Sequence, residues 1–202
     1  MHDLWYNKVA PPLRAAVGRT VRLPLPLNPL ILQRHLRTAR RLRYENDLCL
    51  HLGCGRRRID GFVNIDLNPS AATDYVGSIV ELPCRTGSVK RIETYHVIEH
   101  LSHRVVKSAV ANWHAALSRG GSLIIECPNF DEAVREYLGG CDGRLMNIFG
   151  LQRFPGDTHV FGYNATRLRR LLEEVGFREV VEEEPIDYHT ASEPCIRVRA
   201  VK

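Results

Sequence analysis

The sequence has no long hydrophobic run, and this absence limits the classes of protein that it can encode. None of its apolar stretches approaches the ~20 residues that a helix needs to cross a bilayer. Pro11, Pro12 and Arg14 interrupt the start of the chain, where a signal peptide would have its apolar core. We therefore expect a cytoplasmic protein without a transmembrane segment.

Paired cysteines are also lacking. The six cysteines are scattered, form no C-x-x-C pair and follow none of the spacings typical of metal sites. Cys49 and Cys127 lie inside apolar runs, where cysteine behaves as a small hydrophobic residue. The pattern indicates a reducing compartment rather than a disulfide framework. It also gives no reason to expect a bound metal.

The chain beyond residue 58 has no excess of basic residues, although the net charge of the whole sequence is +5. Residues 1–43 are rich in proline and arginine, and the segment 23–27 suits an extended conformation. Asn28-Pro29 is typical of a helix start, with Asn28 as the N-cap. The arginines of the helix that follows lie opposite an apolar stripe of Leu30, Ile31, Leu36, Ala39 and Leu42.

We therefore expect two parts, a basic N-terminal extension with an amphipathic helix over residues 1–43 and a main domain over residues 44–202. A basic extension suits nucleic acid, anionic lipid or a phosphorylated acceptor. The alternative is a solvated helix face without a partner.

Short apolar runs alternate with helical patterns from residue 48 onward. The predicted strands are 48–52, 62–66, 74–77, 91–95, 122–127, 178–182 and 195–201. Apolar residues at helical spacing predict a helix over 106–117, ended by Gly120-Gly121, and a second over 166–175, ended by Gly176. The alternation predicts parallel strands with right-handed crossovers. Because the last two strands have no helix between them, we expect an α/β, doubly wound, Rossmann-like, mainly parallel sheet with a C-terminal antiparallel hairpin.

Two features follow the first two strands. Gly53-Cys54-Gly55 comes directly after the first strand, and Asp66 ends the second. In doubly wound folds a ligand lies beyond the carboxyl ends of the strands, and glycines let the backbone approach it closely. A carboxylate at that point accepts hydrogen bonds from a ribose diol. The third glycine of a dinucleotide fingerprint is missing, so the pattern favours an adenosyl ligand over NAD.

Several segments resemble, in the right order, the class I S-adenosylmethionine-dependent methyltransferases. The most similar group is the small bacterial set often labelled methyltransferase type 11. The similar segments are 50–55, 61–66, 96–101, 118–129, 157–163 and 168–177. The resemblance runs from about residue 48 to the C-terminus. It implies that residues 44–202 form a methyltransferase domain with S-adenosylmethionine as its cofactor.

The resemblance also assigns the cofactor contacts. The implied residues are His51, Gly53, Cys54, Gly55, Asp66, Leu67, Ser78, Ile79, Tyr95 and His96. The glycine turn would pass under the methionine and ribose, and Asp66 would hold the ribose hydroxyls. Leu67, Ser78 and Ile79 would surround the adenine. His51 and Ser78 stand where the group commonly has acidic residues, which puts one methionine contact in doubt and weakens one adenine contact.

Tyr95 and His96 would line the methionine end and the reaction site, and we expect His96 and His159 to be candidate catalytic residues. A loop histidine such as His159 can take a proton from a hydroxyl or amine acceptor, although many such residues are merely solvated. We interpret Glu99-His100 as the start of the next helix, with the carboxylate near its positive end. Asn164 is interpreted as a helix N-cap.

The expected function is methyl transfer from S-adenosylmethionine to a small-molecule or saccharide acceptor. An RNA methyltransferase is the first alternative, because of the basic N-terminal segment, but no aromatic-interleaved basic patch accompanies it. A catalytically inactive binding protein with the same fold is the second alternative, favoured by the absence of a visible inserted substrate lid. An NAD-dependent oxidoreductase ranks last. The oligomeric state is not predicted.

Overall fold

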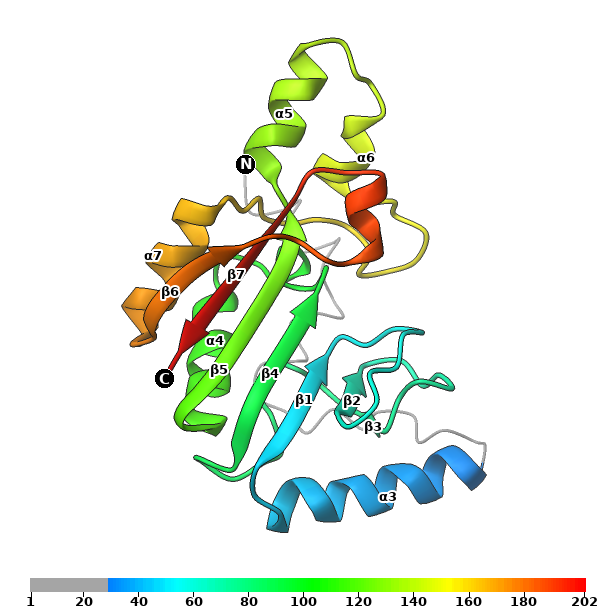
Figure 1. Ribbon diagram of the computed structural model, residues 1–202. Coiled ribbons are helices and arrows are strands. Elements are labelled where there is room, and N and C mark those ends of the chain that lie inside the picture. The colour runs from blue at the N-terminus through cyan, green and yellow to red at the C-terminus, as the bar shows by residue number, and fades with distance from the viewer. Residues whose placement is uncertain (1–28) are drawn as a thin grey trace, which may run out of the picture.

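A computed structural model describes residues 29–202, so the predictions for residues 1–28, including the extended segment 23–27 and the Asn28 cap, lie outside the described residues. The described chain contains a seven-stranded sheet with helices around it (Figure 1). The strands are β1 (Leu48–Leu52), β2 (Val63–Asp66), β3 (Tyr75–Val76), β4 (Val89–Tyr95), β5 (Leu117–Pro128), β6 (Arg178–Glu183) and β7 (Cys195–Val201). The helices are α3 (Pro29–Tyr44), η1 (Ile98–His100), α4 (Val106–Ala116), α5 (Phe130–Leu138), α6 (Arg144–Phe149), α7 (Ala165–Val175) and η2 (Tyr188–Ala191).

The order of the strands across the sheet is β3-β2-β1-β4-β5-β7-β6. The first five strands in that order pair in parallel. β7 lies between β5 and β6 and is antiparallel to both. The predicted Rossmann-like α/β fold with a C-terminal antiparallel hairpin is confirmed. All seven strands lie where the sequence predicts them, with small shifts at their ends except in β5, which begins at Leu117 rather than at Ser122.

The first four strands are connected differently from the prediction. No helix lies between β1 and β2, between β2 and β3 or between β3 and β4, all of which fall within the described residues. The sequence analysis predicted βαβ units without naming a helix between these strands, and this half of the sheet lacks the helical connections of such units. Coil segments make these crossovers, because the connections are short or carry turn residues such as Gly61 and Gly87, both with positive φ.

The two faces of the sheet differ in polarity. One row of residues in register across five strands is entirely apolar and consists of Val63, Leu50, Ile92, Leu123 and Ala200. This face joins a single hydrophobic core with Trp113 of α4 and Leu172 of α7. Figure 1 shows the helices α4 and α7 together on one side of the sheet. The next row projects from the opposite face and is mainly polar: Asn64, His51, Glu93, Ile124 and Arg199.

The basic helix α3 packs beside β3 and buries Thr38 and Leu42. His35 accepts a hydrogen bond from the backbone of Val76 at 3.1 Å and stacks on Tyr75 with ring centroids 4.5 Å apart. Leu36, which the sequence places in the buried stripe, is 60% exposed, and Leu30 is exposed as well. The side of α3 that contacts β3 is therefore rotated from the predicted stripe, because it includes the polar side chain of His35 as well as apolar residues.

Two boundaries show how local chemistry ends a helix. α4 ends at Ala116, earlier than predicted, and β5 begins at once at Leu117. Gly120-Gly121 lies inside β5, where the register with β4 shifts and Gly120 has a φ of 76°. α7 ends as predicted, with Gly176 in the left-handed conformation at a φ of 112°. None of the described helices is long and apolar enough to cross a membrane.

Helices α5 and α6 form a unit between β5 and α7 that the sequence analysis does not predict. Figure 1 shows them above the carboxyl ends of β4 and β5, at the opposite end of the molecule from α3. Asn129 is the N-cap of α5, and its side chain accepts from the backbone of Glu132. The sequence analysis, in which no inserted segment was visible between the strands, therefore missed this unit.

Candidate active site

The turn after β1 takes a conformation that requires glycine. Gly53 and Gly55 have φ angles of 68° and 53°, in the left-handed region that other residues rarely adopt. The backbone amides of Gly53 and Cys54 donate to the carbonyl of Ile65, at 2.8 and 3.1 Å, and so hold the turn against β2. A Cβ on Gly53 would lie 2.2 Å from Cγ2 of Val97, whereas one on Gly55 would meet nothing within 4 Å. The turn is therefore tightly packed at Gly53 and open at Gly55.

Asp66 faces this turn from the end of β2. The backbone amide of Gly55 donates to its Oδ2 at 2.8 Å, and the amide of Asn68 donates to its Oδ1 at 2.8 Å. Each carboxylate oxygen has a further lone pair available, and the residue is partly exposed. The glycine turn and the carboxylate, which the sequence places at the ends of neighbouring strands, are thus in direct contact.

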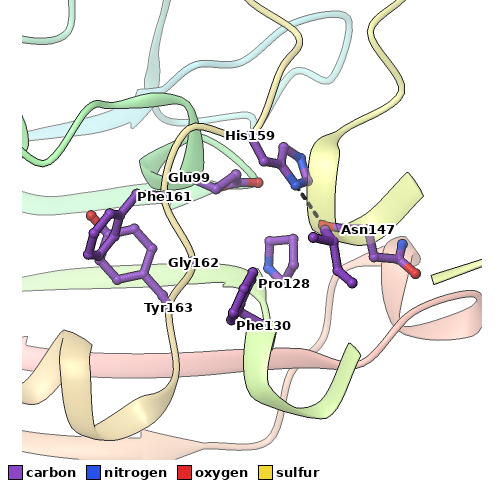
Figure 2. Close-up of a pocket in the computed structure, with 9 residues that line it drawn as sticks. Glu99, Pro128, Phe130, Asn147, His159, Phe161, Gly162 and Tyr163 are labelled. Atoms are coloured by element: carbon purple, nitrogen blue, oxygen red, sulfur yellow. Dashed lines mark hydrogen bonds between the residues drawn. The ribbon is translucent and has the colours of Figure 1, made fainter. Parts of the chain in front are cut away.

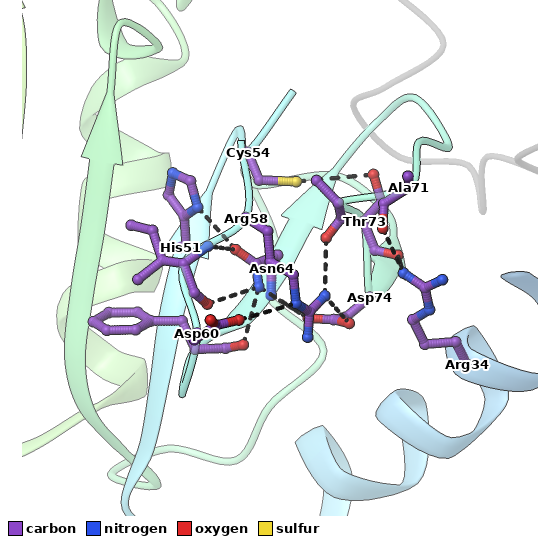
Figure 3. Close-up of polar contacts among 12 residues, drawn as sticks. Arg34, His51, Cys54, Arg58, Asp60, Asn64, Ala71, Thr73 and Asp74 are labelled. Carbon is purple, nitrogen blue, oxygen red and sulfur yellow. Dashed lines mark hydrogen bonds and ion pairs between the residues drawn. The ribbon is translucent and has the colours of Figure 1, made fainter. Parts of the chain in front are cut away.

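His51 belongs to a buried polar network on the mainly polar face of the sheet (Figure 3). Its Nδ1 lies 3.0 Å from Oδ1 of Asn64. Asn64 also donates to Asp74, which receives a 2.7 Å hydrogen bond from Arg58. Burial lowers the pKa of His51, so the ring is neutral near neutral pH. The network explains why a histidine stands here, and the sequence analysis did not single out Asn64, Asp74 or Arg58.

The residues assigned to the adenine differ in exposure. Leu67, directly after Asp66, is 54% exposed, so its side chain is accessible to a ligand. Ile79 is buried, and its carbonyl accepts from the indole nitrogen of Trp113 at 2.6 Å. Ser78 is partly buried, and its hydroxyl accepts from the backbone of Val80 at 3.1 Å. Cys54 is buried next to Thr73, and burial raises its pKa to about 12. The thiol of Cys54 is thus a packing group near neutral pH.

Tyr95 ends β4 inside a charged cluster. Its hydroxyl donates to Glu93 at 2.7 Å, and the guanidinium of Arg57 lies 5.0 Å from its ring centroid. Arg57 forms an ion pair with Asp187, which precedes η2. The segment between β6 and β7 is therefore fastened to the glycine turn across the end of the sheet.

His96 lies directly after β4 with a φ of 52°. Its ring is tilted over that of His189 at a centroid distance of 3.7 Å, and its Nδ1 lies 3.6 Å from Glu193. Burial, together with the neighbouring histidines, lowers the pKa of His96 to about 3. A group with so low a pKa is a weak proton acceptor. His96 is therefore poorly suited to general-base catalysis.

Glu99 lies in the first turn of a helix, as interpreted from the sequence, but that helix is a single short 3-10 turn and not the start of α4. It lies in the short helix η1, and α4 begins only at Val106. The residue is 2% exposed, and neither carboxylate oxygen has a hydrogen-bond partner among residues 29–202. Nδ1 of His96 lies 3.5 Å from Oε1. Burial raises the pKa of Glu99 to about 8.

His159 reaches the same place from the loop before α7 (Figure 2). Its Nδ1 lies 2.7 Å from the backbone carbonyl oxygen of Asn147, and its ring is 5.0 Å from that of His100. Burial lowers the pKa of His159. Glu99, His159 and Tyr163 line a cavity of about 10 Å³, and the Tyr163 hydroxyl has no hydrogen-bond partner within the described chain. The two predicted catalytic histidines thus both lie close to Glu99, a residue that the sequence analysis assigned a structural role.

Comparisons with known proteins extend this description. No protein-family model and no curated protein matches the sequence. Among solved structures, the chain is similar to a SAM-dependent methyltransferase from Archaeoglobus fulgidus, with 16% identity, a TM-score of 0.55 and coverage of 86% of this chain and 93% of that one. A SAM-dependent methyltransferase from Methanosarcina mazei matches at 17% identity and a TM-score of 0.55, over 87% of this chain and 98% of that one.

A third similar structure has its ligands bound. It is the 1,6-didemethyltoxoflavin-N1-methyltransferase of Burkholderia thailandensis with 1,6-didemethyltoxoflavin and S-adenosylhomocysteine. The identity is 14% and the TM-score 0.54, over 87% of this chain and 77% of that one. The chain therefore has the Rossmann-like fold of class I methyltransferases. The resemblance to the type 11 group stays a prediction.

Proposed function

We propose that the protein binds S-adenosylmethionine and transfers its methyl group to a small-molecule or saccharide acceptor. The observation that carries this proposal is the hydrogen bond from the Gly55 amide to the Asp66 carboxylate, 2.8 Å long. It joins a close-approach glycine turn to a partly exposed carboxylate at the carboxyl ends of neighbouring parallel strands, which is where doubly wound folds bind nucleosides. The similarity in fold to methyltransferases supports the same conclusion.

The residues present fit this cofactor. Asp66 would accept the two ribose hydroxyls on its remaining lone pairs, and the open space beside Gly55 leaves room for the ribose and methionine. The exposed side chain of Leu67 would cover one face of the adenine. His51 is committed to Asn64, so we expect it to position the turn rather than bind the methionine amino group.

The bound cofactor would supply an activated methyl group on a sulfonium, and the chain then needs mainly to align the acceptor and exclude water. The cluster around His96 and Glu99 lies beyond the glycine turn, at the carboxyl end of β4. α5, α6 and the loop before α7 close this region from above (Figure 1). These elements would form the acceptor side of the site.

Large apolar side chains are exposed on these elements, and they favour an acceptor with an apolar or ring surface. They are Tyr137, Met146, Phe149, Phe154 and Phe161. Aromatic side chains also stack on the faces of sugar rings, which suits a saccharide. The exposed arginines of α3 lie at the other end of the molecule (Figure 1), so they do not favour RNA at this site.

Calorimetric titration with S-adenosylhomocysteine tests the cofactor assignment. Loss of hydrogen bonds to a charged group is worth about 1.5–3 kcal/mol, so Asp66→Ala should weaken binding by about 10- to 100-fold. Asp60→Ala is the matched control, because Asp60 lies exposed in the nearby β1–β2 connection, and it should bind as the wild type does. Wild-type affinity in Asp66→Ala would disprove the ribose assignment.

The acceptor is tested by measuring S-adenosylhomocysteine release from S-adenosylmethionine in the presence of small molecules, saccharides or RNA. Turnover with a small molecule or saccharide supports the proposal. Turnover with RNA alone, at a rate that falls steeply with salt, would favour the nucleic-acid alternative. Tight cofactor binding without turnover by any acceptor would favour the inactive binding protein.

A further inference from the structure

Three potential metal ligands meet beside the candidate reaction site. We call Glu99, His100 and His159 the Glu99 cluster; the first two belong to η1 and the third to the loop before α7. Their ligand atoms, one from each residue, all lie within 4.8 Å of one another. The cluster joins residues almost 60 positions apart in the chain, so its assembly depends on the tertiary fold.

Glu99 lacks what a buried carboxylate needs. The residue is only 2% exposed, and neither carboxylate oxygen has a hydrogen-bond partner among residues 29–202. An unpartnered buried polar group destabilises a protein by about 1–3 kcal/mol, and by more if it is charged. Figure 2 shows the carboxylate directed toward the side of the cavity on which His159 lies. A cation at this point would satisfy the carboxylate.

Both histidines of the cluster are oriented as metal ligands usually are. Nδ1 of His100 lies 3.0 Å from the backbone oxygen of Thr158, and Nδ1 of His159 lies 2.7 Å from that of Asn147. A carbonyl oxygen only accepts hydrogen bonds, so each Nδ1 must carry the proton. The neutral ring then has its free lone pair on Nε2. A bond to a backbone carbonyl, like one to a carboxylate or a water molecule, fixes the tautomer of a metal-binding histidine.

We propose that the Glu99 cluster binds a divalent first-row transition metal ion through the Glu99 carboxylate and the Nε2 atoms of His100 and His159. Two imidazoles and one carboxylate suit ions such as Zn²⁺, Mn²⁺ or Co²⁺, whereas Mg²⁺ and Ca²⁺ prefer sites made of oxygen atoms. The adjoining cavity of about 10 Å³ has the size of one water molecule. Three protein ligands leave coordination positions open on the ion.

A second group of ligands, His96, His189 and Glu193, lies close by. It has less need of an ion because its carboxylate already accepts a hydrogen bond from the Asn147 side chain. The absence of paired cysteines gave no reason to expect a metal, but this cluster contains no cysteine. A ligand role for His159 would also replace the general-base role expected from its place in a polar loop.

The test uses the full chain, freed of metal with a chelator and titrated with Co²⁺ and then with Zn²⁺ in the absence of any cofactor. We expect one equivalent of Co²⁺ to give a visible absorption band, which Zn²⁺ then removes. Mutation of a residue that only supports a metal ligand weakens metal binding by about 10- to 100-fold. Removal of a ligand itself should have a larger effect, so we expect each of Glu99→Gln, His100→Gln and His159→Gln to weaken binding by more than about tenfold. His103→Gln is the matched control, because His103 is exposed and lies three residues from His100; it should bind as the wild type does.

Several results would overturn the proposal. One is a wild-type chain that binds less than one equivalent of either ion; another is unchanged affinity in Glu99→Gln and His159→Gln. Loss of binding in His189→Gln but not in His159→Gln would place the ion in the second group instead. Circular dichroism of each variant shows that it is folded, and the half-buried His159 provides a test even if Glu99→Gln is unstable. Because metal binding is measured without cofactor, its failure is distinct from failure of the proposed methyl transfer.

Discussion

The guanidinium of Arg197 donates to the carboxylate of Glu126 at 3.0 Å, between the neighbouring strands β7 and β5, and both side chains are buried. The same carboxylate accepts from the backbone amides of Ile186 and Asp187. One acidic side chain thus holds the segment between β6 and β7 against the mainly polar face of the sheet. Asp187 in turn pairs with Arg57 of the glycine turn.

Glu126→Ala should be strongly destabilising. Removing one member of a buried ion pair leaves the other charge uncompensated and reduces the free energy of unfolding by about 3–5 kcal/mol. Glu183→Ala removes the half-exposed partner of Arg197, and the effect of an exposed ion pair is about 0–1 kcal/mol. Urea unfolding at equilibrium measures both. Equal losses in the two variants would show that the pair with Glu126 is not the dominant contact.

Gly53→Ala should be more destabilising than Gly55→Ala. Both substitutions place a side chain in the left-handed region, at about 1–2 kcal/mol, but only the Cβ at residue 53 would collide with Val97. We expect an additional loss of about 1–3 kcal/mol for that collision. Adding Val97→Ala to Gly53→Ala should restore part of the loss, which a double-mutant cycle of unfolding free energies detects. Strictly additive losses would contradict the close contact.

Stability should depend on pH through Asp74. Burial tends to raise the pKa of Asp74, but hydrogen bonds from Arg58 and Asn64 outweigh it and hold that pKa below its ordinary value. Because the folded state binds its proton less readily than the unfolded state, the stabilisation is complete above the unfolded pKa and is lost as the pH falls through the folded value. The urea midpoint of the wild type should therefore fall more steeply than that of Asp74→Asn as the pH is lowered from about pH 5 through the unfolded pKa of about 3.9 and below it.

Asp60→Asn is the control for this pH dependence, since Asp60 is exposed and lies 3.5 Å from the same guanidinium of Arg58. Its urea midpoint should follow that of the wild type across the range. If Asp74→Asn instead shows the same slope as the wild type, the hydrogen bonds of Asp74 do not set its pKa.

The free thiols should differ widely in reactivity. Cys141 is exposed, whereas Cys54 and Cys127 are buried and burial raises the pKa of both. The thiolate is the reactive form, so iodoacetamide should label Cys141 first in the native protein, and Cys54 only after unfolding. Mass spectrometry of the labelled peptides measures the order. As a control, Cys141→Ser should remove the fast phase of labelling. Labelling of Cys54 in the native protein at the rate of Cys141 would contradict the burial of Cys54.

The strands and the ends of several helices could be predicted because their signals are local. β1 and β7 lie where their apolar runs begin and end, and Gly176 and Asn164 end and cap α7 as expected. The side chain of Asn164 accepts from the backbone of Arg167 at 2.7 Å. The sequence also carried a signal for α5 that the analysis did not use, namely Asn129 followed by Asp131 and Glu132.

The remaining features depend on contacts that no short window contains. The six residues of α6 have no side-chain N-cap, and the coil crossovers of the first four strands lack a pattern of their own. The exposure of Leu36 results from contacts between α3 and β3, about 40 residues away. Propensity and periodicity do not include such contacts.

The candidate site also has one part that could be predicted from the sequence and one part that could not. Gly55 and Asp66 could be placed together because adjacent parallel strands bring their carboxyl ends to one edge. Glu99 and His159 could not, because 60 residues and two unpredicted helices separate them. The local signal was the His96-Val-Ile-Glu99-His100 segment itself, which gathers three potential ligands within five residues. A helix-start interpretation of Glu99 concealed that signal.

The position of β7 has a consequence for how the protein is made. Within the described chain β6 pairs only with β7, so β7 alone joins it to the rest of the sheet. On the ribosome, therefore, residues 178–183 can pack on α7 but have no strand to pair with until the segment 195–201 has emerged. The loop that carries Asp187 and His189 lies between these two strands, so it is held at both ends only once β7 has paired with β5 and β6.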